Sequence, residues 1–178
     1  MLNLYKFFSY FIIPIIIINL YLRLINNKED KKRYKERLGN TDYNLNLSKK
    51  IIWIHAASVG EFKSCNLIIE KYYSNFHILV TTTTKSSADY VNKFYCNKVI
   101  HQFIPFDVPM WCSKFLNRWK PSLVLWVESD IWPNMLKIIR DKKIKCFYIN
   151  ARISPKSFNK WKKLKKLYLE SLSTFNKI

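Results

Sequence analysis

The hydrophobic pattern of the chain changes at about residue 50. From there on, short apolar runs alternate with longer segments in which apolar residues recur at steps of three or four. Runs of the first kind predict buried β-strands, and segments of the second kind predict amphipathic helices. The predicted strands are 50–58, 77–84, 98–107, 122–129 and 144–152, and the predicted helices are 60–76, 86–96, 109–120, 130–143 and 154–172.

This alternation of strands and helices predicts an α/β domain. Parallel strands need crossover connections, and helices on both faces of the sheet provide them. We therefore expect a Rossmann-like, doubly wound parallel sheet over residues 50–178. Ser86 or Ser87 is the expected N-cap of the second helix, and Asp130 the expected N-cap of the fourth.

The first 27 residues follow a different pattern. An apolar run extends from about Phe7 to Ile25, close to the roughly 20 residues that a membrane-spanning helix needs. No small-x-small cleavage pattern follows it, so a cleaved signal peptide fits poorly. Both a tilted span and a helix lying in the membrane interface remain open, because the run is interrupted by Ser9, Pro14, Asn19 and Arg23.

The apolar run is followed by a segment dense in Lys and Arg. Positive charge of this kind flanks membrane segments on their cytoplasmic side. The predicted organisation is a membrane-anchor segment over 1–27, a basic juxtamembrane linker over 28–49 and the Rossmann-like domain over 50–178. This domain is expected to face the cytoplasm.

Four widely spaced cysteines indicate reduced, mostly buried thiols in a cytosolic compartment: Cys65, Cys96, Cys112 and Cys146.

The chain is strongly basic, with a formal net charge of +19 over 178 residues. Such charge favours anionic partners, which include nucleic acid, anionic lipid and phosphorylated substrates. A solvated surface in a lysine-rich proteome is the alternative. The last predicted helix, 154–172, presents the same choice, because its apolar stripe and lysines suit either an anionic lipid surface or packing on the sheet. With three histidines and no pairing of His with Cys, no metal site is predicted.

Candidate chemistry gathers where the five predicted strands end. In open α/β sheets, ligands bind at the carboxyl ends of the strands. All five ends carry small polar, acidic or amide residues, in the sequences "HAASVGE", "TTTTKSS", "PFD", "ESDIWPN" and "NARIS". The candidate site residues are His55, Ser58, Gly60, Glu61, Thr83, Thr84, Asp107, Glu128, Asn134 and Arg152.

Three of these residues allow two interpretations from position alone. Glu61 falls on a first helical turn, where it either satisfies the helix end or acts as a general base. His55 is either a satisfied histidine at a strand end or a substrate contact. Glu128 ends a very apolar strand, which favours a hydrogen-bonded structural carboxylate or a site residue. Gly60, one of two glycines, is expected to provide a positive φ or a close backbone approach at the strand-to-helix turn.

A series of motifs occurs in a characteristic order. "ERLG" at 36–39 is followed by "WIHAASVGEF", "LVTTTT", "PFDVP" with "FLNRWKP", "VESDIWPN" and "NARIS". Together they resemble the amino-terminal half of the transferases that add 3-deoxy-D-manno-octulosonic acid (Kdo) to lipid A precursors in Gram-negative bacteria. The resemblance covers nearly the whole chain. It implies the acceptor-side half of a two-domain glycosyltransferase-B fold, with its N-terminal membrane anchor.

The resemblance also implies roles for individual residues. Glu61 matches the Glu of the family's S-[VI]-G-E motif, and would be the general base for the 6′-OH of the lipid IVA disaccharide. Attack on the anomeric carbon of Kdo would displace CMP from the donor CMP-Kdo with inversion. Glu128, in the motif that resembles the family's E-x-E-x-W-P-N, matches a second functionally important acid of that family. Two departures are Asp130, where the family usually has Glu, and Ser86–Ser87, where it usually has Thr-Gly.

The family's donor-binding half has no counterpart within these residues, so two alternatives accompany the enzymatic interpretation. The chain could be a catalytically inactive remnant or a membrane-bound binding module for acidic glycolipid. It could also act with a separately encoded donor half. No cofactor is expected. The sequence contains no P-loop, dinucleotide fingerprint or usual nucleic-acid-binding motif, so nucleic acid is not an expected partner. The resemblance implies lipid IVA as a partner, and the basic charge favours an anionic membrane surface.

Overall fold

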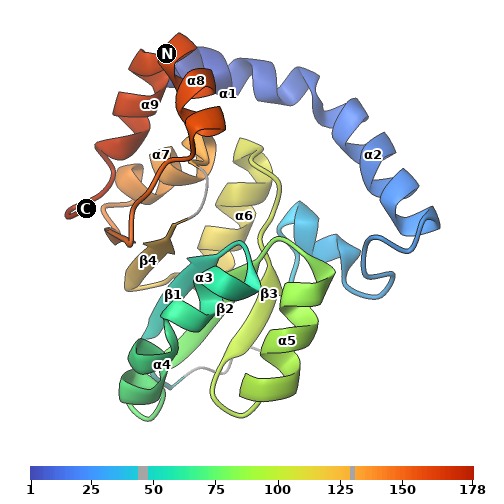
Figure 1. The fold of residues 1–178 in the computed structure, drawn as a ribbon. Helices are drawn as coiled ribbons and strands as arrows, with labels where there is room; N and C mark the ends of the chain where they lie inside the picture. Colours follow the sequence, from blue (N-terminus) through green and yellow to red (C-terminus); the bar gives the residue numbers. More distant parts are fainter. Residues whose placement is uncertain (44–47, 129–130) are drawn as a thin grey trace.

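The computed structural model of the protein describes residues 1–43, 48–128 and 131–178. At its centre lies a five-stranded sheet in the order β3-β2-β1-β4-β5, with every pair of neighbours parallel. The predicted parallel, doubly wound sheet is therefore confirmed (Figure 1). The strands are β1 (Ile51–Ala56), β2 (His77–Thr82), β3 (Ile100–Phe103), β4 (Leu123–Val127) and β5 (Lys145–Ile149).

Helices connect the strands and cover both faces of the sheet. One face is covered by α3, α4 and α5, and the other by α6, α7 and α9. α8 follows β5 and lies beside α9. The helices of this part are α3 (Val59–Ser64), α4 (Asn66–Tyr72), α5 (Lys85–Tyr95), α6 (Pro109–Trp119), α7 (Pro133–Asp141), α8 (Pro155–Lys163) and α9 (Lys165–Leu172).

The two-residue period of the strands divides the core into two layers. Trp53 and Trp126 point to the α6–α7 side, where they pack with Phe115. Their neighbours Ile54 and Val127 point to the α3–α5 side. All five side chains are fully buried. Because successive side chains alternate between faces, β1 and β4 contribute buried side chains to both helical layers. The two strands are parallel, so their carboxyl ends lie at the same edge of the sheet.

Two predicted helices are each divided in the structure. The helix predicted over 60–76 is interrupted at Cys65, where the Ser64 hydroxyl donates to the Glu61 carbonyl at 2.7 Å and so competes with the helical hydrogen bonds. The helix predicted over 154–172 is interrupted at Leu164. The expected N-cap of α5 was wrong, because the residue that caps it is Thr84, which accepts from the Ser87 N–H at 3.1 Å. The expected cap Asp130 lies outside the described residues.

Residues 28–40 of the predicted linker lie against the β3 edge of the sheet. They include a 3-10 helix, η1 (Tyr34–Leu38). The carboxylate of Glu36 accepts from the Phe103 N–H at 2.7 Å, and the Arg33 guanidinium donates to the His101 carbonyl at 2.8 Å. This part of the segment is thus packed on the sheet through side chains that bond the backbone of β3.

The β5 edge is paired by residues near the end of the chain. The Tyr148 N–H donates to the Lys177 carbonyl at 3.0 Å, and the Asn176 N–H donates to the Cys146 carbonyl at 2.8 Å. A parallel bridge joins Phe147 to Lys177. The segment after α9 therefore extends the sheet beyond β5.

The N-terminal apolar run forms two helices, α1 (Leu2–Phe11) and α2 (Ile13–Ile25). In the described part of the chain, no helix is by itself both long and apolar enough to cross a membrane, whereas α1 and α2 together meet that test but are bent by 57°. α1 packs on α7 and α9, and α2 arches away before the chain returns to η1 (Figure 1). The membrane anchor therefore stays a prediction.

Both N-terminal helices leave a large apolar surface uncovered. Only Leu2 and Leu20 are buried among their large apolar side chains. Many exposed apolar side chains on adjacent helices are typical of contact with a membrane or another protein. The exposed side chains within residues 2–25 are Leu4, Phe7, Phe8, Tyr10, Phe11, Ile12, Ile15, Ile18, Tyr21, Leu22 and Ile25.

Candidate active site

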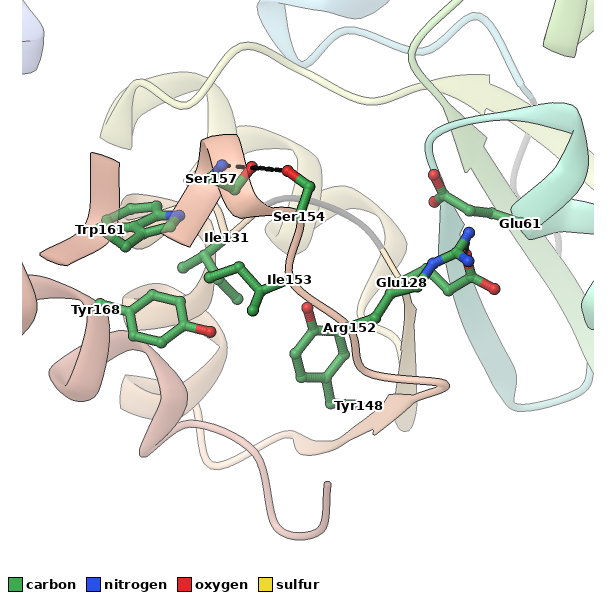
Figure 2. Close-up of a pocket in the computed structure, with 10 residues that line it drawn as sticks. All are labelled: Glu61, Glu128, Ile131, Tyr148, Arg152, Ile153, Ser154, Ser157, Trp161 and Tyr168. Atoms are coloured by element: carbon green, nitrogen blue, oxygen red, sulfur yellow. Dashed lines mark hydrogen bonds and ion pairs between the residues drawn. The ribbon is translucent and has the colours of Figure 1, made fainter. Parts of the chain in front are cut away.

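A pocket of about 430 Å³ lies at the carboxyl edge of the sheet. The loops after β1, β4 and β5 form one side of it, and α8 and α9 form the other (Figure 2). The position agrees with the expectation that ligands of open α/β sheets bind beyond the strand ends. Its lining residues are Glu61, Glu128, Ile131, Tyr148, Arg152, Ile153, Ser154, Ser157, Trp161 and Tyr168.

Glu61 reaches the pocket from the first turn of α3. Ser58 is the N-cap of this helix, and its hydroxyl accepts from the Glu61 N–H at 3.3 Å. In return, one carboxylate oxygen of Glu61 accepts from the Ala57 N–H at 2.7 Å and the other from the Ser58 hydroxyl at 3.2 Å. This reciprocal arrangement resembles a capping box, in which a Ser at the N-cap pairs with a Glu three residues later. Glu61 therefore caps the helix while its carboxylate is held at the pocket.

Gly60 does not make the strand-to-helix turn, so that expectation was wrong. It is the second residue of α3 and lacks a positive φ. A Cβ placed on it would meet only the Ser58 hydroxyl at 3.9 Å, an ordinary contact distance. The turn is instead made by extended backbone at Ser58, with φ −124° and ψ 166°. An N-cap Ser has extended backbone, so it can end the strand and begin the helix without a glycine. The sequence pattern alone does not show which of these residues makes the turn.

Glu128 sits at the end of β4 in a left-handed backbone conformation, with φ +48°. Such a conformation is rare for residues other than glycine, and it clusters at functional sites. The side chain is 8% exposed and forms an ion pair with Arg152, which is 74% exposed. Its other oxygen accepts from the amide of Asn150, another residue with positive φ. The strand ends of β4 and β5 are thus joined at the pocket by a buried carboxylate.

The opposite wall of the pocket is aromatic and comes from elements that sequence reasoning did not assign to the site. Trp161 of α8 and Tyr168 of α9 lie with ring centroids 5.2 Å apart, and Figure 2 shows them across the pocket from Glu61. Ser154 caps α8 through the Ser157 N–H. The amphipathic spacing over 154–172 was a usable signal, because these aromatic side chains belong to its apolar stripe.

The remaining strand-end residues near Glu61 have structural contacts. The Thr83 hydroxyl donates to the Ala57 carbonyl at 2.8 Å. His55 is fully buried, its Nδ1 lies 2.9 Å from the Thr81 hydroxyl, and it packs on Trp126 with ring centroids 4.4 Å apart. Burial lowers the pKa of His55 to about 3, so the ring is neutral at pH 7. None of these side chains lines the pocket.

Asp107 and Asn134 lie away from the pocket, beneath α1. The Asp107 carboxylate accepts from the N–H groups of Asn134 and Met135 at 3.2 and 2.8 Å, so it caps α7. It also accepts from the Tyr5 hydroxyl at 3.1 Å, while the Asn134 amide donates to the Ser9 hydroxyl at 3.2 Å. Burial raises the pKa of Asp107 to about 6. The structure thus gives both residues contacts that hold α1 to the domain.

The pocket combines two carboxylates, an arginine and aromatic faces. A carboxylate can accept a proton from a hydroxyl, and aromatic faces with a few polar groups are typical of small-molecule sites. Within the described ranges, no group of three or more His, Cys, Asp or Glu residues is placed to hold a metal ion. The arrangement suits proton transfer from a bound hydroxyl.

Comparisons with known proteins identify the family of the chain. Residues 32–178 match the family described as 3-deoxy-D-manno-octulosonic-acid transferase (kdotransferase). The 3-deoxy-D-manno-octulosonic acid transferase of Rickettsia bellii is 36% identical over 100% of this chain and 43% of its own length. The probable mitochondrial enzyme of that name from Arabidopsis thaliana is 33% identical, over 89% of this chain and 36% of its own length.

The chain spans about half the length, or less, of the curated relatives it matches, with shares of 43% and 48% for the proteins of Rickettsia bellii and Rickettsia typhi. The matched region nevertheless covers most of the chain, from residue 32 to residue 178, and includes every strand of the sheet and every residue of the pocket. The chain therefore belongs to the 3-deoxy-D-manno-octulosonic acid transferase family of glycosyltransferases.

Proposed function

We propose that the protein acts in lipopolysaccharide synthesis as the acceptor-side part of a Kdo transferase, with lipid IVA as the acceptor and CMP-Kdo as the donor. Family membership supports the reaction class. The observation that carries the site assignment is the Glu61 carboxylate, held at the edge of the pocket by the Ala57 N–H at 2.7 Å and the Ser58 hydroxyl at 3.2 Å.

In the proposed reaction, Glu61 removes the proton from the 6′-OH of the acceptor. The acceptor oxygen forms a bond to the anomeric carbon of Kdo while the bond from that carbon to the CMP phosphate oxygen breaks. CMP leaves with the bonding electrons, and the anomeric configuration inverts because attack and departure occur on opposite faces. The two hydrogen bonds to Glu61 orient its carboxylate and limit its rotation, which favours proton transfer in a fixed geometry.

The rest of the pocket supports binding of a sugar. The rings of Trp161 and Tyr168 offer apolar faces to a pyranose, and the Glu128–Arg152 pair offers charged groups at the opposite side. Arg152 is mostly exposed, so its guanidinium has room to turn towards an anionic group of a substrate. We assign the donor-binding groups to a second half, fused or separately encoded.

We place the protein at the cytoplasmic face of the inner membrane. The exposed apolar side chains of α1 and α2 support contact with lipid, and the net charge of +19 supports attraction to an anionic membrane and to a phosphorylated glycolipid. The bend of 57° between the helices fits a pair lying in the interface as well as a broken span.

The decisive variant is Glu61→Gln. Gln keeps the capping interactions of the S-x-x-E/Q pattern but cannot accept the proton. Transfer of Kdo from CMP-Kdo to lipid IVA is measured with the chain alone and with the chain co-expressed with the carboxyl-terminal half of the Rickettsia bellii relative. General-base catalysis contributes roughly 10²- to 10⁴-fold, so we expect a loss of at least about 100-fold.

The matched control is Glu70→Gln, which removes an exposed carboxylate of α4 that pairs with Lys98. It is expected to leave the rate unchanged. Undiminished transfer by Glu61→Gln would rule out Glu61 as the base. Absence of transfer by the unsubstituted chain in both arrangements, together with binding of lipid IVA, would instead favour a glycolipid-binding module.

A further inference from the structure

A continuous series of polar contacts runs from α2 to the carboxylate of Glu61. It begins at Arg23 of α2, whose guanidinium donates to Glu29 at 3.1 Å. Glu29 also accepts from Arg37 at 3.0 Å. These three residues belong to the N-terminal part of the chain, whereas Glu61 follows β1, so the contacts link segments that are distant in sequence.

Arg37 is the centre of this series. Its guanidinium donates to the Thr83 carbonyl at 2.6 Å and to the Ile104 carbonyl at 3.3 Å, in addition to Glu29. It lies over the ring of Phe103 at 4.4 Å from the centroid. The side chains of Arg37 and Glu29 are only 4% and 1% exposed. A planar guanidinium with donors in several directions can reach both strand ends and the carboxylate at once, which an ammonium group cannot do.

The series continues from Thr83 to the candidate base. The Thr83 hydroxyl donates to the Ala57 carbonyl at 2.8 Å, and its N–H approaches the same oxygen at 3.4 Å. The Ala57 N–H in turn donates to the Glu61 carboxylate at 2.7 Å. The backbone of Ala57 is thus held on one side by the β2 loop and itself holds Glu61 on the other.

Stability alone gives a weak reason for a buried ion pair at this place. The desolvation of two buried charges offsets much of their attraction, and apolar residues of similar volume often replace such a pair without loss of stability. The effect of the pair here is on geometry. The Arg37 guanidinium, held by Glu29, binds the carbonyl groups that follow β2 and β3, those of Thr83 and Ile104.

We propose that Arg37, held by Glu29, is a positioning residue for Glu61 and acts through Thr83 and the backbone of Ala57. The proposal rests on the function proposed above for Glu61. Loss of the Arg37 guanidinium frees the Thr83 carbonyl, loosens the loop against Ala57 and lets the Glu61 carboxylate leave its orientation at the pocket.

The first experiment needs no enzymatic activity. Amide hydrogen exchange is measured on the full chain in detergent, with Ala57 as the reporter and Leu125, in the centre of the sheet, as the reference. Arg37→Lys is expected to speed exchange at Ala57 at least tenfold relative to Leu125. Arg118→Lys, which alters another guanidinium that donates to a backbone carbonyl, is expected to leave the ratio unchanged. An unchanged ratio in Arg37→Lys would overturn the proposal.

Two further variants keep the test decisive if Arg37→Lys does not fold. Thr83→Val keeps the shape and the backbone carbonyl but removes the hydroxyl that bonds Ala57. The double variant Glu29→Met with Arg37→Leu removes both buried charges together and so leaves neither unpaired. Both are expected to speed exchange at Ala57 at least tenfold while Leu125 stays protected. Normal exchange at Ala57 in both would overturn the proposal.

The second experiment measures the transferase reaction in the arrangement that supports it. Because misplacement of a reacting group by a fraction of an ångström reduces the rate of the chemical step, Arg37→Lys is expected to lower kcat about tenfold with the KM for lipid IVA unchanged. Faster exchange at Ala57 with an unchanged kcat would overturn the positioning role. Retained activity in Glu61→Gln would refute the proposed role of Glu61 as the base, whereas the exchange experiment would still decide whether Arg37 controls the loop.

Discussion

The two glycines of the chain have opposite structural requirements. Gly39 ends η1 with φ +75°, and a Cβ placed on it would lie 2.4 Å from the Trp111 carbonyl oxygen. Gly60 lies in α3, where a Cβ would make only an ordinary contact with the Ser58 hydroxyl at 3.9 Å. The residue that conformation restricts to glycine is therefore the one in "ERLG", and the glycine before Glu61 is not required by the fold of this chain.

Substituting each glycine by alanine tests this contrast. Gly39→Ala is expected to lower the free energy of unfolding by at least about 2 kcal/mol, because a left-handed conformation costs about 1–2 kcal/mol and the Trp111 carbonyl must also move. Gly60→Ala is expected to raise it by about 0.4–1 kcal/mol, because alanine restricts the unfolded chain. Denaturant unfolding of both variants measures the difference, and equal midpoints would contradict it.

At the scale of the elements, the sheet was predictable, whereas the ends and breaks of helices were less so. The short apolar runs predicted the strands, and the polar residues at the ends of those strands predicted where the pocket lies. The break at Cys65 depends on a local competition for the Glu61 carbonyl, which the apolar spacing does not encode. Arg37 was not singled out, because one buried arginine is indistinguishable in sequence from the many Lys and Arg residues at the surface.

The exposed surface of α1 and α2 is the element whose role depends most on its surroundings. Phe11 and Ile25 are 66% and 72% exposed there. If this surface enters a bilayer, each side chain contributes about 1.5–3 kcal/mol of transfer free energy. The double variant Phe11→Ser with Ile25→Ser is therefore expected to weaken binding to vesicles of anionic phospholipid by more than tenfold, as measured by co-sedimentation.

The matched control for this experiment is Leu67→Ser with Phe94→Ser. These side chains are also apolar and exposed, at 82% and 56%, but lie on α4 and α5. Their replacement is expected to leave vesicle binding unchanged. Equal losses in the two double variants would show that α1 and α2 do not form a dedicated lipid-binding surface.

For the molecule as a whole, buried titratable groups make stability depend on pH in opposing directions. Burial lowers the pKa of His55 and of His101 to about 3. The unfolded chain takes up their protons near pH 6.5 and the folded protein does not, so both remove stability as the pH falls from about 6.5 towards 3. Asp107, whose pKa burial raises to about 6, works oppositely, because the folded state takes up its proton first.

Asp107→Asn isolates the second contribution. Between about pH 6 and pH 4, a folded state that holds one proton more than the unfolded state gains about 1.4 kcal/mol per pH unit on acidification. The variant lacks this gain, so its free energy of unfolding is expected to fall more steeply than that of the unsubstituted protein over this range. Denaturant unfolding at pH 6, 5 and 4 measures both slopes, and parallel curves would contradict the assignment.

The pairing at the two borders of the sheet has a consequence for self-association. An open parallel sheet normally leaves two strands with unpaired backbone groups, which can recruit strands of other molecules and start aggregation. Here Glu36 and Arg33 bond the free backbone of β3, and residues 176–177 bond that of β5. Within the described residues, neither border offers a run of free donors and acceptors, so the sheet is protected from strand-to-strand association between molecules.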